Sequence, residues 1–418
     1  MSKTRWRCSA LLLLLGWGVK AGAQQALTWE QVRNRFENNN PTLQAGQFSI
    51  SESKAQEITA YLRPNPNFTA TADQIDPFPG GPPHGPFAYF LPVASVNYLH
   101  ERQHKRELRL ESAQKATAIA TSDQADLERT LIFTLRGAFV QTLQAKAVLN
   151  VAQENLKYYD RMLDVSSERY KAGDIALIDL DRLQLQRLQY ESDLQTAEVN
   201  LRTAKIGLLM LLNDRAPIEH FDVTGPFDFT NQLSSLDEFR NLALDTRPDL
   251  KAANQSVDKA RTDHNLAVAN GSTDPTFSFD VGRNPPIDAY IGASISIPLR
   301  IFDRNQGEKL RTQLDIDRNQ RLLDATKAQV FSDVDSAYAV LDSTLALLRP
   351  YKEKYLQQAV RVRDTVSFAY QHGGASLLDF LQAENDYRTV ELNYVNLVGS
   401  YLTAASQLNL AVGREVIP

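Results

Sequence analysis

The sequence predicts a mainly α-helical protein with a small β part, in which one structural unit is written twice along the chain. Three observations lead to this fold class. Two stretches of about 70 residues carry helical periodicity, short segments alternate in hydrophobicity, and blocks of sequence recur in the same order in both halves. The mature chain, 24–418, is therefore expected to be a single unit of two repeats, 27–213 and 235–413.

The duplication is clearest around two glycines that lie 200 residues apart. "RYKAGDIALIDLDRLQ" begins at Arg169 and "AYQHGGASLLDFLQAE" begins at Ala369. Three further blocks match between the halves in the same order, which chance does not produce. The matched pairs around the glycines are Tyr170 and Tyr370, Gly173 and Gly373, Leu177 and Leu377, and Asp179 and Asp379.

Each repeat is expected to begin with two helices. The first is short and amphipathic. The second follows a proline, Pro41 or Pro248, which is favourable at the start of a helix because the first helical position needs no N–H donor. The expected ranges are 29–38 and 236–245 for the first helix, and 42–62 and 249–270 for the second.

Two short strands follow in each repeat and are expected to form membrane hairpins at 65–99 and 274–299. In "TFSFDVG", Phe277, Phe279 and Val281 share one face, because side chains alternate along a strand. The opposite face carries small or polar residues. A strand with these two faces suits a wall between lipid and water.

The longest predicted elements are two helical hairpins, 102–212 and 304–412. Apolar residues recur at three- and four-residue spacing, as at Leu131 and Leu135, and Pro350 is expected to kink the second copy. A helix of about 70 residues is roughly 100 Å long at 1.5 Å per residue. Such helices cannot surround one compact core, so they are expected to pack as coiled coils with each other or with other chains.

The first 23 residues have the pattern of a secretory signal peptide. Basic residues precede an apolar run, and Ala21-Gly22-Ala23 supplies a small-residue cleavage site. Cys8, the only cysteine, precedes the apolar run, so the mature chain is expected to be exported, without disulfides and not lipidated. The mature chain has 45 − 4 = 41 basic residues against 50 acidic ones, which argues against nucleic acid as a partner.

The strands require partner chains if they cross a membrane. No apolar run after residue 23 approaches the ~20 residues that a membrane helix needs. Four strands per chain cannot close a barrel, since the smallest membrane barrels need about eight, so several chains would share one. An exported, long-helical and oligomeric chain with a few membrane strands is expected to be a conduit.

At this point the chain resembles a known family, the TolC-like outer-membrane efflux proteins, over essentially its whole mature length. The resemblance rests on "ALTWEQVRNRFENNNPTLQA", on "ISIPLRIFDRNQGE" and on the turns "RYKAGDIALIDLDRLQLQ" and "AYQHGGASLLDFLQAEN". It implies a homotrimer with a shared twelve-stranded β-barrel in outer-membrane lipid and an α-helical barrel in the periplasm. It also implies docking onto a periplasmic membrane-fusion adaptor protein and, through it, an inner-membrane pump.

The resemblance assigns the glycine turns to an adaptor-docking tip. Gly173 and Gly373 match tip glycines that contact the adaptor, and Asp174, Leu177 and Leu377 lie beside them. Judged without the resemblance, the glycines would be turn residues that end a helix. No cofactor, metal site or catalytic residue is expected.

The resemblance also implies a periplasmic gate. Asp379 matches a gate aspartate, Gln382 stands where a second gate acid often occurs, and Tyr370 and Asp179 match a tyrosine–aspartate link that holds the closed tip. Ala375 stands where an arginine ties the tip in relatives, so the closed tip is expected to have fewer links and to open more easily. From the sequence alone, both aspartates could equally be acids favoured at a helix N-terminus.

One motif indicates a different chemistry. His100-Glu101-Arg102-Gln103-His104 has the H-E-x-x-H spacing of zinc proteases. The corresponding stretch of repeat two, 302–306, contains no histidine, and a zinc-protease motif belongs inside a buried helix with a further ligand downstream. We expect a polar strand–helix junction, although His100 and His104, four apart on a helix, could still bind a metal adventitiously.

Four functions remain in competition. The first is the exit duct of a tripartite efflux pump, a passive channel opened by adaptor docking, and the second is the exit duct of a type I protein-secretion system. The third is a non-porous periplasmic coiled-coil scaffold, which needs neither the duplication nor the two-faced strands. An enzyme is least supported, because no paired carboxylates, nucleophile elbow or phosphate loop occurs in a matching context.

Overall fold

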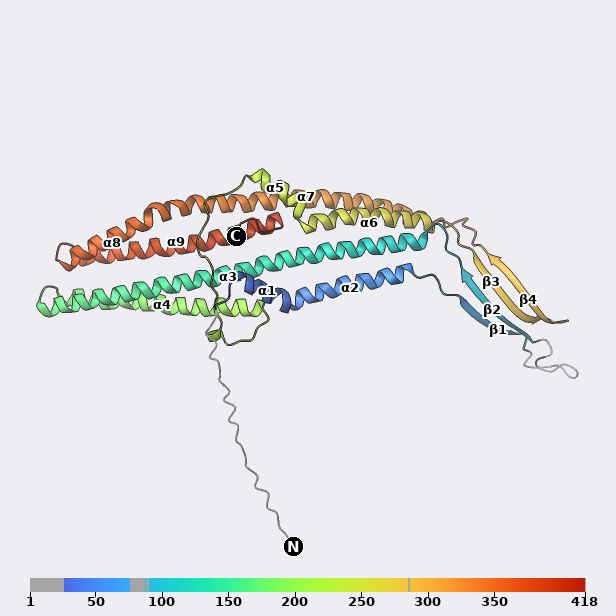
Figure 1. The fold of residues 1–418 in the computed structure, drawn as a ribbon, viewed down its shortest axis with the longest axis horizontal. Coiled ribbons are helices and arrows are strands. Elements are labelled where there is room, and N and C mark those ends of the chain that lie inside the picture. The colour runs from blue at the N-terminus through green and yellow to red at the C-terminus, as the bar shows by residue number, and fades with distance from the viewer. Residues whose placement is uncertain (1–25, 76–86, 88–89, 285, 418) are drawn as a thin grey trace, which may run out of the picture.

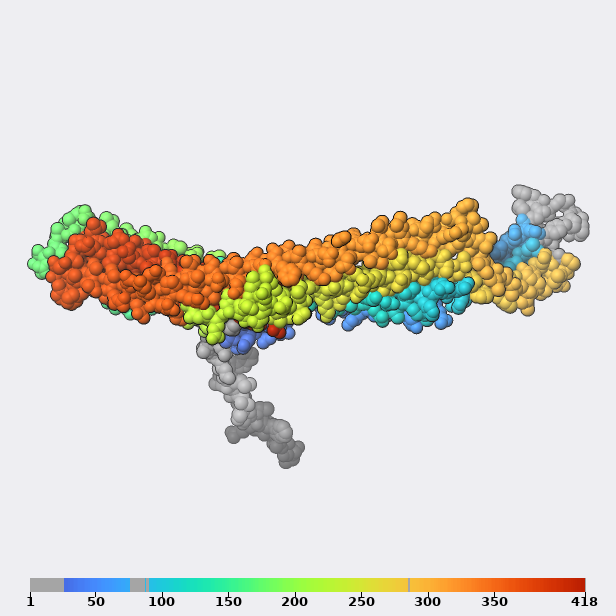
Figure 2. Space-filling view, turned by 90° about the horizontal axis from the view of Figure 1, so that it is seen from above, coloured from blue at the N-terminus to red at the C-terminus, as the bar shows by residue number. Residues whose placement is uncertain are grey.

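The computed structural model describes residues 26–75, 87, 90–284 and 286–417. The expected signal peptide, 1–23, lies outside these residues. The described chain is a long, narrow bundle of helices with a β-sheet at one end (Figure 1), and it remains narrow when turned by 90° (Figure 2). The predicted fold class, mainly helical with a small β part, is confirmed.

Both halves of the chain show the same order of elements: two helices, two strands and a long helical hairpin. The first arm of the second hairpin is divided by a π-helical turn, 351–355. The first half contains α1 (Trp29–Asn39), α2 (Pro41–Tyr61), β1 (Asn67–Asp73), β2 (Leu91–Leu99), α3 (Lys105–Ala172) and α4 (Leu177–Leu211). The second half contains α5 (Leu236–Thr246), α6 (Pro248–Asn270), β3 (Thr276–Asn284), β4 (Ile287–Ser296), α7 (Gln306–Pro350), α8 (Leu356–Gln371) and α9 (Leu377–Val412).

Capping residues and prolines set the ends of the short helices. Asn40 separates α1 from α2: its backbone N–H donates to the carbonyl of Phe36, and its side-chain oxygen accepts from the backbone N–H groups of Thr42 and Leu43 at 2.9 and 3.1 Å. Pro41 then occupies the first position of α2, where no N–H is needed. The predicted bounds of α1, α2, α5 and α6 are all within one residue of those observed.

Helix α3 is 68 residues long, which corresponds to roughly 100 Å. The second long helix is interrupted after Pro350, as predicted. Proline lacks the N–H of the helical ladder and its ring crowds the preceding turn, and the π-helical turn that follows accommodates the break. Within the described ranges, no helix is both long and apolar enough to span a lipid bilayer.

The four strands form one antiparallel sheet in the order β1-β2-β3-β4. Residues that are paired across strands point to the same face of the sheet. In the observed register one face is apolar and the other is small or polar, as predicted. β1 and β4 each pair on one side only, so the sheet has two open edges within the chain. One apolar row contains Phe68, Val96, Phe279 and Ala293, and the adjacent row on the other face contains Thr69, Ser95, Asp280 and Gly292.

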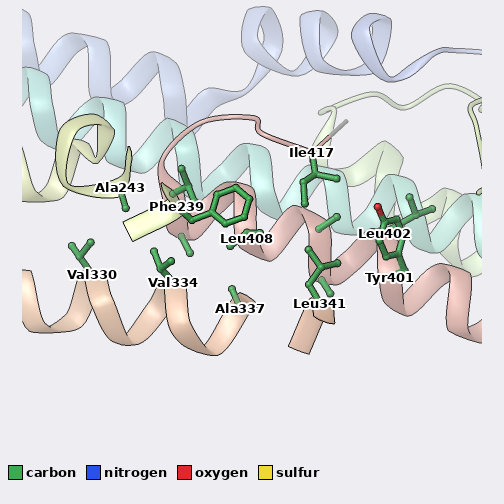
Figure 3. Packing of buried hydrophobic residues seen from close by; sticks show 14 of the residues in the cluster. Phe239, Ala243, Val330, Val334, Ala337, Leu341, Tyr401, Leu402, Leu408 and Ile417 are labelled. Atoms are coloured by element: carbon green, nitrogen blue, oxygen red, sulfur yellow. The ribbon is translucent and has the colours of Figure 1, made fainter. Parts of the chain in front are cut away.

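Three apolar clusters join the helices. The largest connects α5, α7 and α9 near the middle of the molecule and includes Phe239, Leu341 and Leu408 (Figure 3). A second cluster, which includes Phe36, connects α1, α3 and α4 at the same level in the first half. The third lies near the turns and contains Tyr159 with residues of α4, α8 and α9. Each cluster involves helices far apart in the chain, so packing between distant segments holds the bundle together.

The first testable prediction concerns the largest cluster. Leu341 is fully buried, so Leu341→Ala should lower the free energy of unfolding by about 2–5 kcal/mol, because it leaves a cavity in a packed core. Denaturant-induced unfolding followed by circular dichroism measures this loss. Ser343→Ala, at an exposed position of the same helix, is the control and should change stability by less than about 0.5 kcal/mol. Equal loss in the two variants would contradict the role of this cluster.

Candidate functional site

Two turns of matching geometry lie at the end of the molecule opposite the sheet (Figure 1). Gly173 has φ 84° and Gly373 has φ 76°, a region in which a side chain costs roughly 1–2 kcal/mol. In each turn the next residue donates its backbone N–H to a carbonyl five positions earlier, at 2.8 Å from Asp174 and at 2.7 Å from Gly374. We define residues 169–179 and 369–382 as the tip.

The helices that leave the two turns begin differently. Ser376 and Asp379 form a capping box at the start of α9: the Ser376 hydroxyl accepts from the Asp379 backbone N–H at 3.2 Å, and the Asp379 carboxylate accepts from the Ser376 hydroxyl at 2.7 Å and backbone N–H at 3.1 Å. These hydrogen bonds lower the pKa of Asp379. Ala176 occupies the equivalent position before α4 and supplies no side-chain cap, so Asp179 lacks this partner.

Most of the residues expected at the docking tip and the gate are accessible. Asp174, Leu177, Asp379 and Gln382 are exposed, and Leu177 is 53% exposed although it is apolar. Leu377 is half-buried and packs against the third apolar cluster, which contains Tyr159. The turns therefore present both apolar and acidic groups to solvent.

Tyr370 points inward. It is 4% exposed, its ring stacks on Phe380 with centroids 5.0 Å apart, and the Arg169 guanidinium lies 5.2 Å from the ring centroid. Arg169 also donates to the Tyr370 backbone carbonyl at 2.6 Å, which joins the two turns. The Tyr370 hydroxyl has no hydrogen-bond partner among the described residues. The expected link to Asp179 is therefore not formed within one chain.

A buried carboxyl lies one helical turn beyond the Tyr370–Phe380 stack. Glu384 is 5% exposed, and its Oε1 atom has no partner among the described residues. Burial raises the pKa of Glu384 to about 7 and Asp364 adds to this, although the Arg363 guanidinium and the Tyr158 hydroxyl favour the charged form. Arg363 and Asp364 lie on α8 and Tyr158 on α3. The carboxyl is thus placed where the two helical hairpins meet.

Glu384 was missed from the sequence, although a signal for it exists. Phe380 lies four residues before Glu384 and Tyr387 three residues after it, so all three share one helix face. Phe380 is buried, and an acid on the same stripe as a buried aromatic residue is expected to be desolvated.

The H-E-x-x-H stretch is not helical, which corrects one expectation. His100 directly follows β2, α3 begins only at Lys105, and His104 has φ 54°. The Glu101 carboxylate pairs with the Arg109 guanidinium, with one contact of 2.9 Å. The two histidines therefore do not lie four apart on a helix. The part of the chain that the structure describes contains no group of three or more residues able to hold a metal ion.

Comparison with known proteins shows which family this chain is similar to. The family model described as outer membrane efflux protein matches residues 239–414. The chain is 22% identical over 325 residues to the cobalt-zinc-cadmium resistance protein CzcC of Cupriavidus metallidurans, which is 77% of each chain. It is 23% identical over 323 residues to outer membrane protein TolC of Escherichia coli, which is 72% of this chain and 64% of TolC. The family match and these relatives all indicate an outer membrane efflux protein of the TolC-like kind.

The fold of this efflux protein agrees with that of a solved relative. The crystal structure of CusC superimposes with a TM-score of 0.76 at 16% identity and covers 92% of each chain. The relatives with this fold are channel proteins and not enzymes. The predicted location, the outer membrane with the helical part in the periplasm, is confirmed.

The second prediction concerns the pH dependence of the efflux protein. The native state holds the Glu384 proton more tightly than the unfolded state, because its pKa is about 7 against an ordinary 4.5. The neutral carboxyl therefore stabilises the folded state at low pH, and this contribution is lost as pH rises through about 7. The free energy of unfolding should fall by up to about 3 kcal/mol over this range. Glu384→Gln should remove this loss, so the variant should unfold at a higher temperature than the wild type at about pH 8.

Thermal unfolding at about pH 5 and pH 8, compared between variant and wild type, measures this effect. Glu198→Gln changes an exposed glutamate on α4 and serves as the control, with no expected change in the difference between the two pH values. A wild-type pH dependence that survives in Glu384→Gln would show that another group is responsible.

Proposed function

We propose that this efflux protein is the outer-membrane exit duct of a tripartite efflux pump. It would assemble as a homotrimer and let solutes pass from the periplasm to the exterior without catalysing a reaction. The observation that carries the proposal is the apolar surface left uncovered on both flanks of one chain, together with the two open sheet edges. Unpaired edges and large apolar patches are normally covered in the functional protein.

One uncovered surface is a stripe along α4. Its members lie seven residues apart, which is the spacing of a coiled-coil contact. We call this stripe the α4 seam; its apolar members are between 49% and 67% exposed. It contains Ile178, Leu185, Ser192, Val199 and Ile206.

A second uncovered surface lies on α7. Leu310, Leu314, Val340 and Leu347 are each more than half exposed. Along the bundle α4 packs on α3, α3 on α9, and α9 on α7, so α4 and α7 lie on opposite flanks. Contact between α4 of one copy and α7 of the next is head-to-tail, and such contacts close into a ring when the rotation permits.

The sheet supports the same assembly. If β4 of one copy pairs with β1 of the next, three chains give 3 × 4 = 12 strands without an open edge. The apolar face, with Phe68, Ile291 and Ile295 more than 60% exposed, would contact outer-membrane lipid. The face with Thr69 and Asp280 would surround water.

The tip is the proposed docking surface for a periplasmic membrane-fusion adaptor and, through it, an inner-membrane pump. Gly173 and Gly373 set the turns, and Leu177 offers an exposed apolar contact. In the trimer, three copies of Asp379 and Gln382 would line the gate. The gate role is supported by the resemblance to the family and by the exposure of both side chains.

The third prediction tests the assembly. Wild-type protein extracted from outer membranes in mild detergent should have a native mass of three chains and should conduct ions in planar bilayers. Val199→Glu places a charge in the α4 seam and should abolish the trimer, because burying an unpaired carboxylate costs several kcal/mol per copy. Glu198→Lys changes a charge next to the seam but outside it and should still form trimers. A Val199→Glu trimer of normal stability would exclude the seam as the subunit contact.

The fourth prediction tests the tip. Leu177→Lys replaces an exposed apolar side chain without backbone strain, so trimers should form normally, whereas efflux in cells and cross-linking to the adaptor should fall at least tenfold. Glu198→Lys introduces the same charge on α4 far from the turn and should leave both readouts near wild type. Normal adaptor cross-linking by Leu177→Lys would remove this residue from the docking surface.

A further inference from the structure

A cavity of about 310 Å³ lies near the middle of the molecule, between the two repeats. Its volume is at the lower end of the range found for small-molecule sites. Side chains from α1, α3, α9 and the segment after α9 line it. Trp29, Phe133 and Leu410 supply apolar walls, and Arg129, Arg136 and Arg414 supply positive charge.

Arg136 is a cation without an anionic partner. Its guanidinium lies 4.6 Å from the centre of the Trp29 ring, and no carboxylate among the described residues is within ion-pair distance of it. Burial lowers the pKa of Arg136, and the nearby charge of Glu415 opposes this shift. A desolvated guanidinium is stabilised when a carboxylate or a similar anion binds to it.

The second repeat contains an arginine–carboxylate ion pair that the first repeat lacks. There, Arg240 on α5 forms a two-fold ion pair with Asp335 on α7, at 2.8 and 2.7 Å. The two repeats match with an offset of 207 residues around their first helices, as Pro41 and Pro248 show. Arg33 of the first repeat therefore corresponds to Arg240 of the second. The long helices are offset by 202 residues, since buried Phe139 then corresponds to buried Leu341.

With this offset, Phe133 occupies the position of Asp335. The first repeat therefore has an aromatic wall where the second has a carboxylate. Arg33 pairs instead with Glu37 on its own helix at 2.7 Å. The cavity thus combines several arginines with an apolar side and has no counterpart of the Asp335 carboxylate at Phe133.

We propose that this cavity binds a small organic anion that carries a carboxylate on an apolar or aromatic body. The carboxylate would lie against Arg136, and the body would lie against Trp29 and Phe133. Bound there, the anion would connect α1 to α3 and to the segment that follows α9. The proposal concerns one chain and does not depend on the exit-duct function.

Arg136 is the half-buried arginine of the cavity without an ion pair, since Arg33 pairs with Glu37 and Arg414 is exposed to solvent. Arg129 is already engaged, because its guanidinium pairs with Asp126 and donates to the Leu410 carbonyl. Glu128 and Glu415 also line the cavity, but neither forms an ion pair with Arg136. Binding must therefore be strong enough to overcome repulsion from two nearby carboxylates, which favours ligands that also gain apolar contact.

Tryptophan fluorescence gives a direct test. Of the three tryptophans, Trp6 and Trp17 precede residue 23, so Trp29 is the only one in protein whose leader has been removed, as mass spectrometry can verify. We would titrate the detergent-extracted protein with phenylacetate and with its neutral analogue phenylacetamide. Phenylacetate should give a saturable change in Trp29 fluorescence, with an affinity at least tenfold higher than that of phenylacetamide.

Variants separate the site from adventitious binding. Arg136→Gln should weaken phenylacetate binding at least tenfold, Arg136→Lys should weaken it less, and Arg321→Gln, at an exposed position on α7, should leave it unchanged. A non-saturating response, equal affinity for the neutral analogue, or unchanged binding by Arg136→Gln would each overturn the proposal. If Arg136→Gln does not fold, the comparison of the two ligands on wild-type protein still decides.

Discussion

The length of the helices is the constraint on which the other features depend. A helix such as α3, with 68 residues, extends far beyond any core that 418 residues could build around it. Its neighbours can cover only part of its surface, so apolar stripes remain on the flanking helices, such as the α4 seam with Val199 at 61% exposure. An uncovered stripe with seven-residue spacing is a contact for another helix. The subunit interface that we propose would thus follow from the length of these helices.

Local sequence was sufficient to predict the elements and the order in which they occur. Helix starts at Pro41 and Pro248, the break at Pro350 and the left-handed turns at Gly173 and Gly373 each follow from the backbone chemistry of one or two residues. The polarity of the sheet faces follows from alternation within single strands. None of these features requires knowledge of which distant segment packs where.

The features of the site that local sequence did not reveal depend on distant packing. Within one chain Tyr370 does not reach Asp179, because its ring packs between Phe380 and Arg169 inside the tip. Glu384 is desolvated because residues of α3 and α8 close over it. Periodicity along one helix shows which face is buried, whereas the identity of the group opposite that face comes only from the tertiary arrangement.

The two repeats differ at the start of the helices that follow the glycine turns. Ser376 caps α9 through Asp379, whereas Ala176 offers no cap to α4, and a cap of this kind is worth about 1 kcal/mol. The first turn of α4 is therefore easier to unwind than the first turn of α9, although the glycine turns before them have the same geometry. Both hairpins carry a buried aromatic stack, Tyr159–Tyr190 in the first and Tyr370–Phe380 in the second, so the capping box is the feature that distinguishes the two turns.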